Sequence, residues 1–129
     1  MSGQYHIHLL VTGKIKNTKI SPEILCEWFS NLVKLIDMEE FHKPIAKYDE
    51  TVDNEGVTGI VLITTSHSSV HIWDKDGLIQ FDLYSCKEFN DNIVISEIDK
   101  MFDYEFLNTM LIDRNNFTNE VISVGKHIK

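Results

Sequence analysis

The groups of this sequence best suited to act as nucleophile, base and acid lie between residues 58 and 86. Ser66, His71 and Cys86 place a hydroxyl, an imidazole and a thiol in this stretch, and Thr58 adds a second hydroxyl. An imidazole can take a proton from a neighbouring group, and a thiol with an ordinary pKa of ~8.5 can donate one. As a set, these residues predict proton-transfer or nucleophilic chemistry.

Two strands are expected to position these groups, at residues 66–73 and 78–86. Between them stands Asp76-Gly77, a strong signal for a hairpin turn. Folding back at this turn brings Cys86 to the level of Ser66. We therefore expect the hydroxyl, the imidazole and the thiol to meet at one site.

The rest of the sequence predicts the layers that support this hairpin. Ser21-Pro22-Glu23 is a helix start, because a hydroxyl caps the helix and proline suits its first position. The apolar stripe of this helix is expected to comprise Leu25, Trp28, Phe29, Leu32, Leu35 and Ile36. Further strands are expected at residues 5–11, 41–48, 57–65 and 105–112, and a second helix at 93–102. Residues after 114 show weak periodicity and receive no assignment. The pattern predicts one domain over residues 1–129, an α+β two-layer sandwich with two helices on one face of an antiparallel sheet.

Two other chemistries fit the residues less well. A Ser–His hydrolase would need an orienting group and a sharp nucleophile turn, and the sequence has no G-x-S-x-G. A metal site could use His67, His71 and a carboxylate, with His6 and His8 as further ligands. Residues four apart are neighbours on a helix but not on a strand, so we expect no metal. Taken singly, each group also fits a satisfied polar core, and Cys86 a small buried apolar residue.

Composition restricts the possible partners and compartment. The formal net charge of −8 argues against a nucleic-acid partner bound through a basic face. No apolar run reaches the ~20 residues of a membrane span, and the first residues lack the pattern of a signal peptide. The sequence has two cysteines and no CxxC, which is typical of a reduced protein without disulfides. We expect a cytoplasmic protein that binds no membrane.

The central motif resembles that of a known family. Ser66-His67-x-Ser69-x-His71-x-Trp73, followed by Asp82 and Cys86, resembles the signature of the prokaryotic S-adenosylmethionine decarboxylases. The preceding Gly56-Val-Thr-Gly-Ile-Val-Leu is similar to that family's strand before the cleavage serine, and His8-Leu9 is compatible with its first strand. The resemblance covers residues 5–113 in layout and 56–86 in motif.

The resemblance implies a chain that cuts itself. Ser66 would attack the carbonyl carbon of Thr65, and elimination would then leave a pyruvoyl group at the new N-terminus. Thr58 would assist this processing, and His71 would remove the α-proton. Cys86 would later protonate the decarboxylated carbon.

The resemblance also implies a cofactor, a substrate and an assembly. A pyruvoyl group made from Ser66, with no metal, would form a Schiff base with the substrate amine and accept the electrons of the departing carboxylate. The substrate would be S-adenosylmethionine, decarboxylated to the aminopropyl donor of polyamine (spermidine) synthesis. The protein would be a homodimer of cleaved protomers.

The residues expected to bind the nucleoside depart from the family pattern. Pro-Glu usually follows the tryptophan and its glutamate binds the ribose, whereas Asp74 and Lys75 follow Trp73 here. Lysine has no acceptor, so we expect Asp74 or Asp76 to accept from the ribose. Trp73 or Phe41 would supply an aromatic wall for adenine.

Two further departures flank the reacting groups. Thr65 stands where the family usually has glutamate before the serine, and Lys87 stands in place of a glycine after the cysteine. Two alternatives stay open. One, motivated by Asp74-Lys75 in place of Pro-Glu, is a pyruvoyl decarboxylase of ornithine or arginine, and the other is an uncleaved homologue without enzymatic activity.

Overall fold

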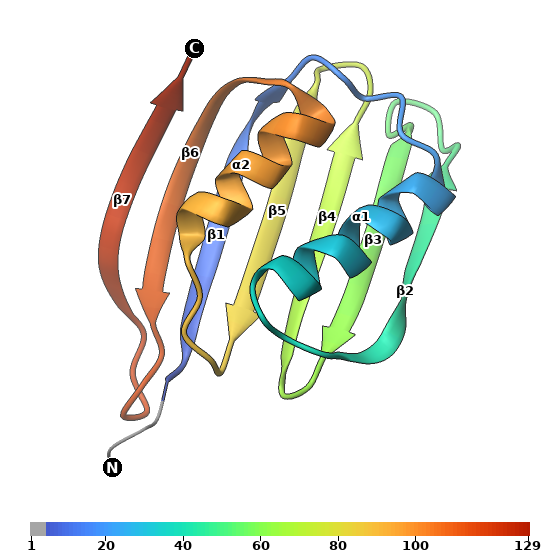
Figure 1. The fold of residues 1–129 in the computed structure, drawn as a ribbon. Helices are drawn as coiled ribbons and strands as arrows, with labels where there is room; N and C mark the ends of the chain where they lie inside the picture. Colours follow the sequence, from blue (N-terminus) through green and yellow to red (C-terminus); the bar gives the residue numbers. More distant parts are fainter. Residues whose placement is uncertain (1–4) are drawn as a thin grey trace.

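One antiparallel sheet of seven strands organises the computed structural model, which describes residues 5–129. The strands and helices are β1 (Ile7–Ile15), α1 (Pro22–Leu35), β2 (Glu40–Asp49), β3 (Gly56–Ile63), β4 (Ser66–Trp73), β5 (Leu78–Ser85), α2 (Asp91–Phe102), β6 (Tyr104–Asp113) and β7 (Glu120–Ile128). The strand order is β2-β3-β4-β5-β1-β6-β7, so β5 lies beside β1, with β4 on its other side. Both helices cover the same face of the sheet (Figure 1). The expected α+β sandwich is thus confirmed.

Helix α1 begins as its sequence predicts. Ser21 has extended backbone angles, and its side chain accepts a hydrogen bond from the backbone N–H of Ile24 at 3.2 Å. The buried stripe differs from the expected one at a single position: Leu35 is 45% exposed, whereas Val33 is 2% exposed. Val33 lies closer than Leu35 to the centre of the apolar face, because it follows Phe29 by four residues.

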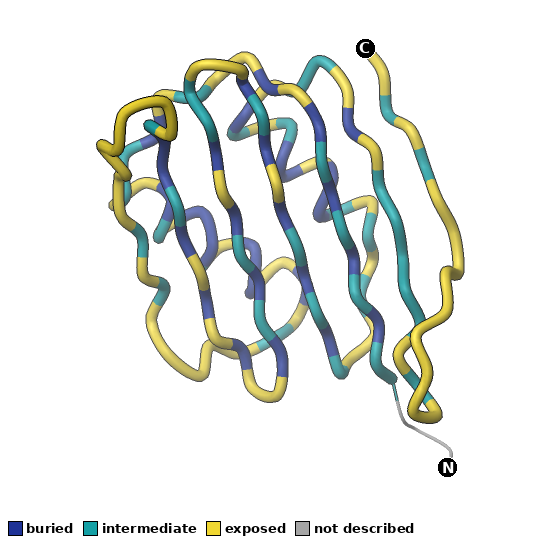
Figure 2. Tube along the Cα trace, turned by 180° about the vertical axis from the view of Figure 1, so that it is seen from behind, coloured by how far each residue is buried: buried dark blue, intermediate teal, exposed yellow. Residues whose placement is uncertain are grey.

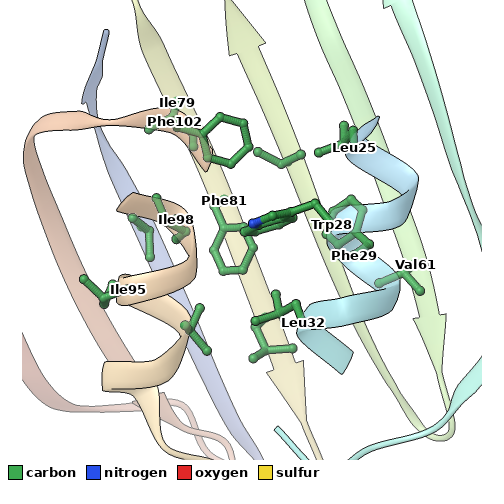
Figure 3. Close-up of a cluster of buried hydrophobic side chains, with 14 of the residues drawn as sticks. Leu25, Trp28, Phe29, Leu32, Val61, Ile79, Phe81, Ile95, Ile98 and Phe102 are labelled. Carbon is green, nitrogen blue, oxygen red and sulfur yellow. The ribbon is translucent and has the colours of Figure 1, made fainter. Parts of the chain in front are cut away.

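The core lies between the two helices and the sheet. Trp28 stands at its centre, with its ring edge-on to Phe81 of β5 and Phe102 of α2 at centroid distances of 6.0 and 5.4 Å (Figure 3). The indole N–H of Trp28 donates to the carbonyl of Glu97 at 3.1 Å, so its one polar atom is satisfied. The alternate apolar residues of β5, Ile79, Phe81 and Leu83, are buried against the helices.

Several element bounds differ from the sequence expectations. Strand β3 ends at Ile63 rather than residue 65, and the β4–β5 turn spans residues 74–77 instead of two residues. Gly77 takes the left-handed conformation there, with a φ of 66°. The β2–β3 register shifts between His42 and Ile45, around Pro44, which has no backbone N–H to donate. The unassigned tail forms the edge strand β7, which is exposed on both faces.

The face of the sheet away from the helices, here called the open face, is uncovered in the single chain (Figure 2). Large exposed apolar side chains stand on it at both edges of the sheet; they are Ile45, Ile60, Leu62, Phe106, Val124 and Ile128. In residues 5–129 no helix is both long and apolar enough to cross a membrane. Residues 1–4, which belong to the segment judged for a signal peptide, lie outside the described residues.

Candidate active site

Ser66 and Cys86 meet at the end of the sheet where β4 begins and β5 ends. The antiparallel register places His67 opposite Tyr84, so Ser66 comes level with the last residue of β5, next to Cys86. The backbone N–H of Cys86 donates to the hydroxyl oxygen of Ser66 at 3.0 Å, and that hydroxyl donates to the Cys86 sulfur at 3.5 Å. The predicted approach of this hydroxyl and this thiol is confirmed.

Thr65 joins this pair from the turn between β3 and β4. Its hydroxyl contacts the Cys86 sulfur and donates to the Thr64 carbonyl at 2.7 Å. Thr65 has a φ of 57°, in the left-handed region. The peptide bond between Thr65 and Ser66 therefore lies at an exposed turn, with the Ser66 hydroxyl one residue from the carbonyl that it would attack.

The pKa values of the two cysteine thiols are shifted in opposite directions. Hydrogen bonds from Ser66, and next from Thr65, lower the pKa of the Cys86 thiol, although partial burial opposes them. Burial, followed by the charge of Glu23, raises the pKa of Cys26. Cys86 is consequently the more acidic thiol and the better proton donor of the two.

A hollow of about 560 Å³ opens beside Ser66 and Cys86. Lys34 and Lys87 contribute cations to its lining, and Asp37 and Glu39 contribute anions. The Lys87 ammonium donates to the backbone carbonyl of Asp37 at 2.6 Å, and so links the Cys86 segment to the loop after α1. The hollow could receive a zwitterionic amino acid, because its lining carries both charges.

Thr58 and His71 form a second hydrogen-bonded pair. They are direct partners across β3 and β4, and the Thr58 hydroxyl lies 2.8 Å from Nδ1 of His71. His71 also stands beside Trp73, with 6.1 Å between ring centroids.

The expectation that the hydroxyl, imidazole and thiol meet within one chain is wrong. Ser66 belongs to the buried set of β4 that faces the helices, whereas His71 lies exposed on the open face. Five strand positions separate them, which corresponds to about 16 Å at ~3.3 Å per residue. An odd separation also places the two side chains on opposite faces of the strand.

The residues expected to bind a nucleoside are dispersed. Phe41 is 74% exposed and lies on β2 at the end of the sheet where Ser66 lies, whereas Trp73 lies at the other end, near His71. The Asp74 carboxylate accepts a 2.5 Å hydrogen bond from the Tyr48 hydroxyl, and this bond raises the pKa of Tyr48 to about 12. Asp76 stands exposed in the β4–β5 turn.

A polar cluster that the sequence interpretation did not assemble occupies the open face. The Asp82 carboxylate accepts from Nε2 of His8 at 2.7 Å and from the Ser69 hydroxyl at 2.5 Å, and Nε2 of His67 lies 3.6 Å away. Burial tends to raise the pKa of Asp82, but the hydrogen bonds from His8 and Ser69 outweigh it and leave the pKa below its usual value. The alternation of Asp82 with buried apolar residues could have predicted from the sequence that its side chain lies on the open face. The pairing of β1 with β5, which brings His8 to Asp82, could not have been predicted in this way.

The same cluster could in principle ligate a metal. One atom each from His8, His67 and Asp82 lie within 4.8 Å of one another. Arg114 approaches Nδ1 of His8 at 3.3 Å. Since a guanidinium only donates, Nδ1 must accept, and the ring proton then sits on Nε2 and points at Asp82. His71, a candidate ligand by its sequence position, is not among these three residues.

Comparisons with known proteins agree with the resemblance. The family model described as S-adenosylmethionine decarboxylase matches residues 11–115. The S-adenosylmethionine decarboxylase proenzyme of Archaeoglobus fulgidus is 35% identical over 69 residues, which are 54% of this chain and 55% of the relative. The proenzyme of Pyrococcus furiosus is 30% identical over 67% of this chain and 60% of its own length. That of Clostridium botulinum is 25% identical over 68% of this chain and 72% of its own. The chain thus matches a little over half the length of the first two relatives.

Proposed function

The chain belongs to the S-adenosylmethionine decarboxylase family, and from that premise we propose that it is a precursor that cleaves itself between Thr65 and Ser66. The resulting pyruvoyl group would decarboxylate S-adenosylmethionine. The observation that carries the proposal is the joint placement of Ser66, Thr65 and Cys86 at one exposed turn.

Cleavage begins with the Ser66 hydroxyl. Its oxygen bonds to the carbonyl carbon of Thr65, the C–N bond breaks, and the hydroxyl proton passes to the nitrogen, so the amide becomes an ester. A base then removes the α-proton of residue 66, and the bond between its Cβ and the ester oxygen breaks. Thr65 leaves as a carboxylate, and water replaces the nitrogen as ammonia. The ketone so formed supplies an electron sink for decarboxylation.

Cys86 suits the later proton donation. Its thiol lies against the side chain that is converted, and its lowered pKa makes it a stronger acid than an ordinary thiol. Lys87, the residue after Cys86, is held to the loop after α1 by the hydrogen bond from its ammonium to the Asp37 carbonyl. This bond limits the motion of the neighbouring thiol.

His71 suits the role of base only if it comes from a second copy. Within one chain His71 lies on the opposite face from Ser66 and at the other end of β4. A two-fold axis that packs two open faces with antiparallel strands would bring Thr58 and His71 of one chain to the end of the partner's sheet where β4 begins. Because the Ser66 side chain faces the helices, the imidazole would have to reach it past that end of the strand, at the exposed Thr65 turn. It would bring Trp73 with them, and Phe41 lies at the receiving end. We therefore propose a homodimer with two composite sites.

The exposed apolar residues of the open face support such packing. Ile60 and Leu62 are 42% and 46% exposed on β3, and Val124 is 71% exposed on β7. Monomeric proteins rarely leave so many large apolar side chains on one face, because covering them is favourable.

For the substrate, the structure also supports a second candidate. Asp74 is engaged by Tyr48, and Lys75 lies 3.8 Å from Asp53 and offers no acceptor. The second carboxylate oxygen of Asp74, Oδ1, has no hydrogen-bond partner but is buried, so neither residue presents an exposed acceptor beside Trp73 for a ribose. This favours, as a second candidate, a pyruvoyl decarboxylase of ornithine or arginine.

Intact mass and labelled substrates test the proposal together. Purified protein should consist of fragments 1–65 and 66–129, the second carrying a blocked N-terminus, and Ser66→Ala should remain whole. Release of labelled CO₂ is then measured from S-adenosylmethionine, ornithine and arginine in parallel. Release from an amino acid alone would establish the second candidate. A wild-type chain that stays whole would instead identify a homologue without this activity.

The role of Cys86 has its own test. Cys86→Ala should still cleave but lose turnover by roughly 10²- to 10⁴-fold, the usual contribution of a positioned acid. It should also inactivate faster during turnover, because misplaced protonation converts the ketone to an amine. Wild-type turnover in Cys86→Ala would remove this thiol from the mechanism.

A further inference from the structure

The turn that carries the cleavage point has an unusual backbone. Six non-glycine residues in the described part of the chain have positive φ values, and four of them are Asp or Asn, which tolerate this region. Thr65, with a φ of 57°, is the β-branched member of the set. A β-branched residue in this region is an outlier, because its side chain crowds the backbone.

The turn type makes the conformation still less favourable. Ile63 pairs with Ser66, so Thr64 and Thr65 form a two-residue loop. Two-residue loops that suit the twist of a hairpin need a positive φ at the first central residue, usually with Asn or Gly present. Here the first central residue, Thr64, does not have a positive φ, whereas the second, Thr65, does.

The surroundings hold Thr65 in this conformation. The backbone N–H of Thr64 donates to the Glu39 carbonyl at 3.2 Å, and the N–H of Cys86 fixes the Ser66 hydroxyl at 3.0 Å. The Thr65 hydroxyl is fixed by Thr64 and Cys86. Strained residues persist in proteins where the environment over-determines them, and they gather at reactive sites.

We propose that the backbone strain at Thr65 accelerates self-cleavage, so that this residue acts through its conformation rather than its hydroxyl. The inference rests on the proposed function. In the amide, the path from the Thr65 carbonyl carbon to the Cα of Ser66 runs through one nitrogen. In the ester it runs through the Ser66 oxygen and Cβ, one atom more, and the loop can relax. The strain is thus partly released as the acyl group moves to oxygen, which favours the forward direction.

Two substitutions separate strain from the hydroxyl. Thr65→Gly removes the steric cost of the positive φ, whereas Thr65→Val keeps the β-branched shape and removes only the hydroxyl. First-order cleavage of freshly made precursor is followed by intact mass. Thr65→Gly should cleave about 5- to 100-fold more slowly than wild type, the range expected for strain at one residue. Thr65→Val should cleave several-fold faster than Thr65→Gly, because it keeps the β-branched shape and with it the strain.

A stability measurement checks the strain itself. In a Ser66→Ala background no chain can cleave, so urea unfolding is reversible and comparable. Thr65→Gly should unfold at a higher urea concentration than its parent, although glycine normally destabilises an ordered position.

The outcomes distinguish this inference from the proposed function. Slow cleavage of Thr65→Gly together with its raised urea midpoint supports the inference. Wild-type cleavage in Thr65→Gly, cleavage of Thr65→Val as slow as that of Thr65→Gly, or a lowered urea midpoint overturns it and leaves the proposed function standing. A wild-type chain that never cleaves overturns both.

Discussion

Mixing two inactive variants tests whether each site is shared between two chains. Ser66→Ala lacks the nucleophile and His71→Ala lacks the base, so each alone should remain whole. In a mixed dimer with composite sites, one site carries both substitutions and the other carries none. The intact site consists of Ser66 on the His71→Ala chain and His71 on the Ser66→Ala chain. Only the His71→Ala chain should therefore be cut.

The geometry sets the size of the expected signal. Within one chain the imidazole lies about 16 Å along the strand from the serine and on the other face, whereas proton transfer needs contact at about 3 Å. No side-chain rotation closes that gap, so cleavage within a chain should contribute nothing. Random pairing of equal amounts puts about half of the His71→Ala chains in mixed dimers, and about that fraction should be cleaved.

The assay uses a mass tag on one variant, joint unfolding and refolding, and intact mass spectrometry. Each variant refolded alone is the control for residual cleavage. The reasoning is refuted if the mixture stays uncut although mass analysis of the native protein finds mixed dimers. It is equally refuted if the tagged and untagged chains are cut in equal amounts.

Three further predictions concern groups with shifted acidity. In uncleaved His71→Ala protein at neutral pH, iodoacetamide should alkylate Cys86 faster than Cys26, because hydrogen bonds from Ser66 and Thr65 lower the pKa of the first and burial raises that of the second; equal rates would contradict this. Asp82→Asn in a Ser66→Ala background should cost roughly 1–3 kcal/mol of unfolding free energy at neutral pH. Since the pKa of Asp82 is lowered in the folded state, its contribution to stability is present above pH ~4 and is lost as the pH falls through the folded pKa. The urea unfolding curves of the two proteins should therefore converge in acid. A difference that stays constant with pH would exclude the carboxylate as the cause. The Tyr48 phenol should ionise near pH 12, as seen in ultraviolet titrations against Tyr48→Phe, and Asp74→Asn should return it to ~10; no change would show that the hydrogen bond is absent in solution.

Local patterns in the sequence determined most of the layers. The Ser21-Pro22 cap and the apolar stripe specified α1, because a helix is built from contacts three and four residues apart. The β-branched and aromatic residues of β4 and β5, together with the turn that ends at Gly77, specified the β4–β5 hairpin. The hairpin in turn brings Ser66 and Cys86 together. Because the turn has four residues rather than the expected two, the sequence located the meeting of Ser66 and Cys86 but defined the strand register only to within two positions.

Tertiary structure decided what depends on distant strands and on where a strand begins. The odd separation of Ser66 and His71 was visible in the sequence, but it separates their faces only because one regular strand includes both. His8 reached Asp82 through the pairing of β1 with β5, which no local period encodes. The left-handed turn at Thr65 also runs against the preference of its own residue type. Such a conformation is imposed by the paired strands on either side, because their hydrogen bonds and packing outweigh the local cost.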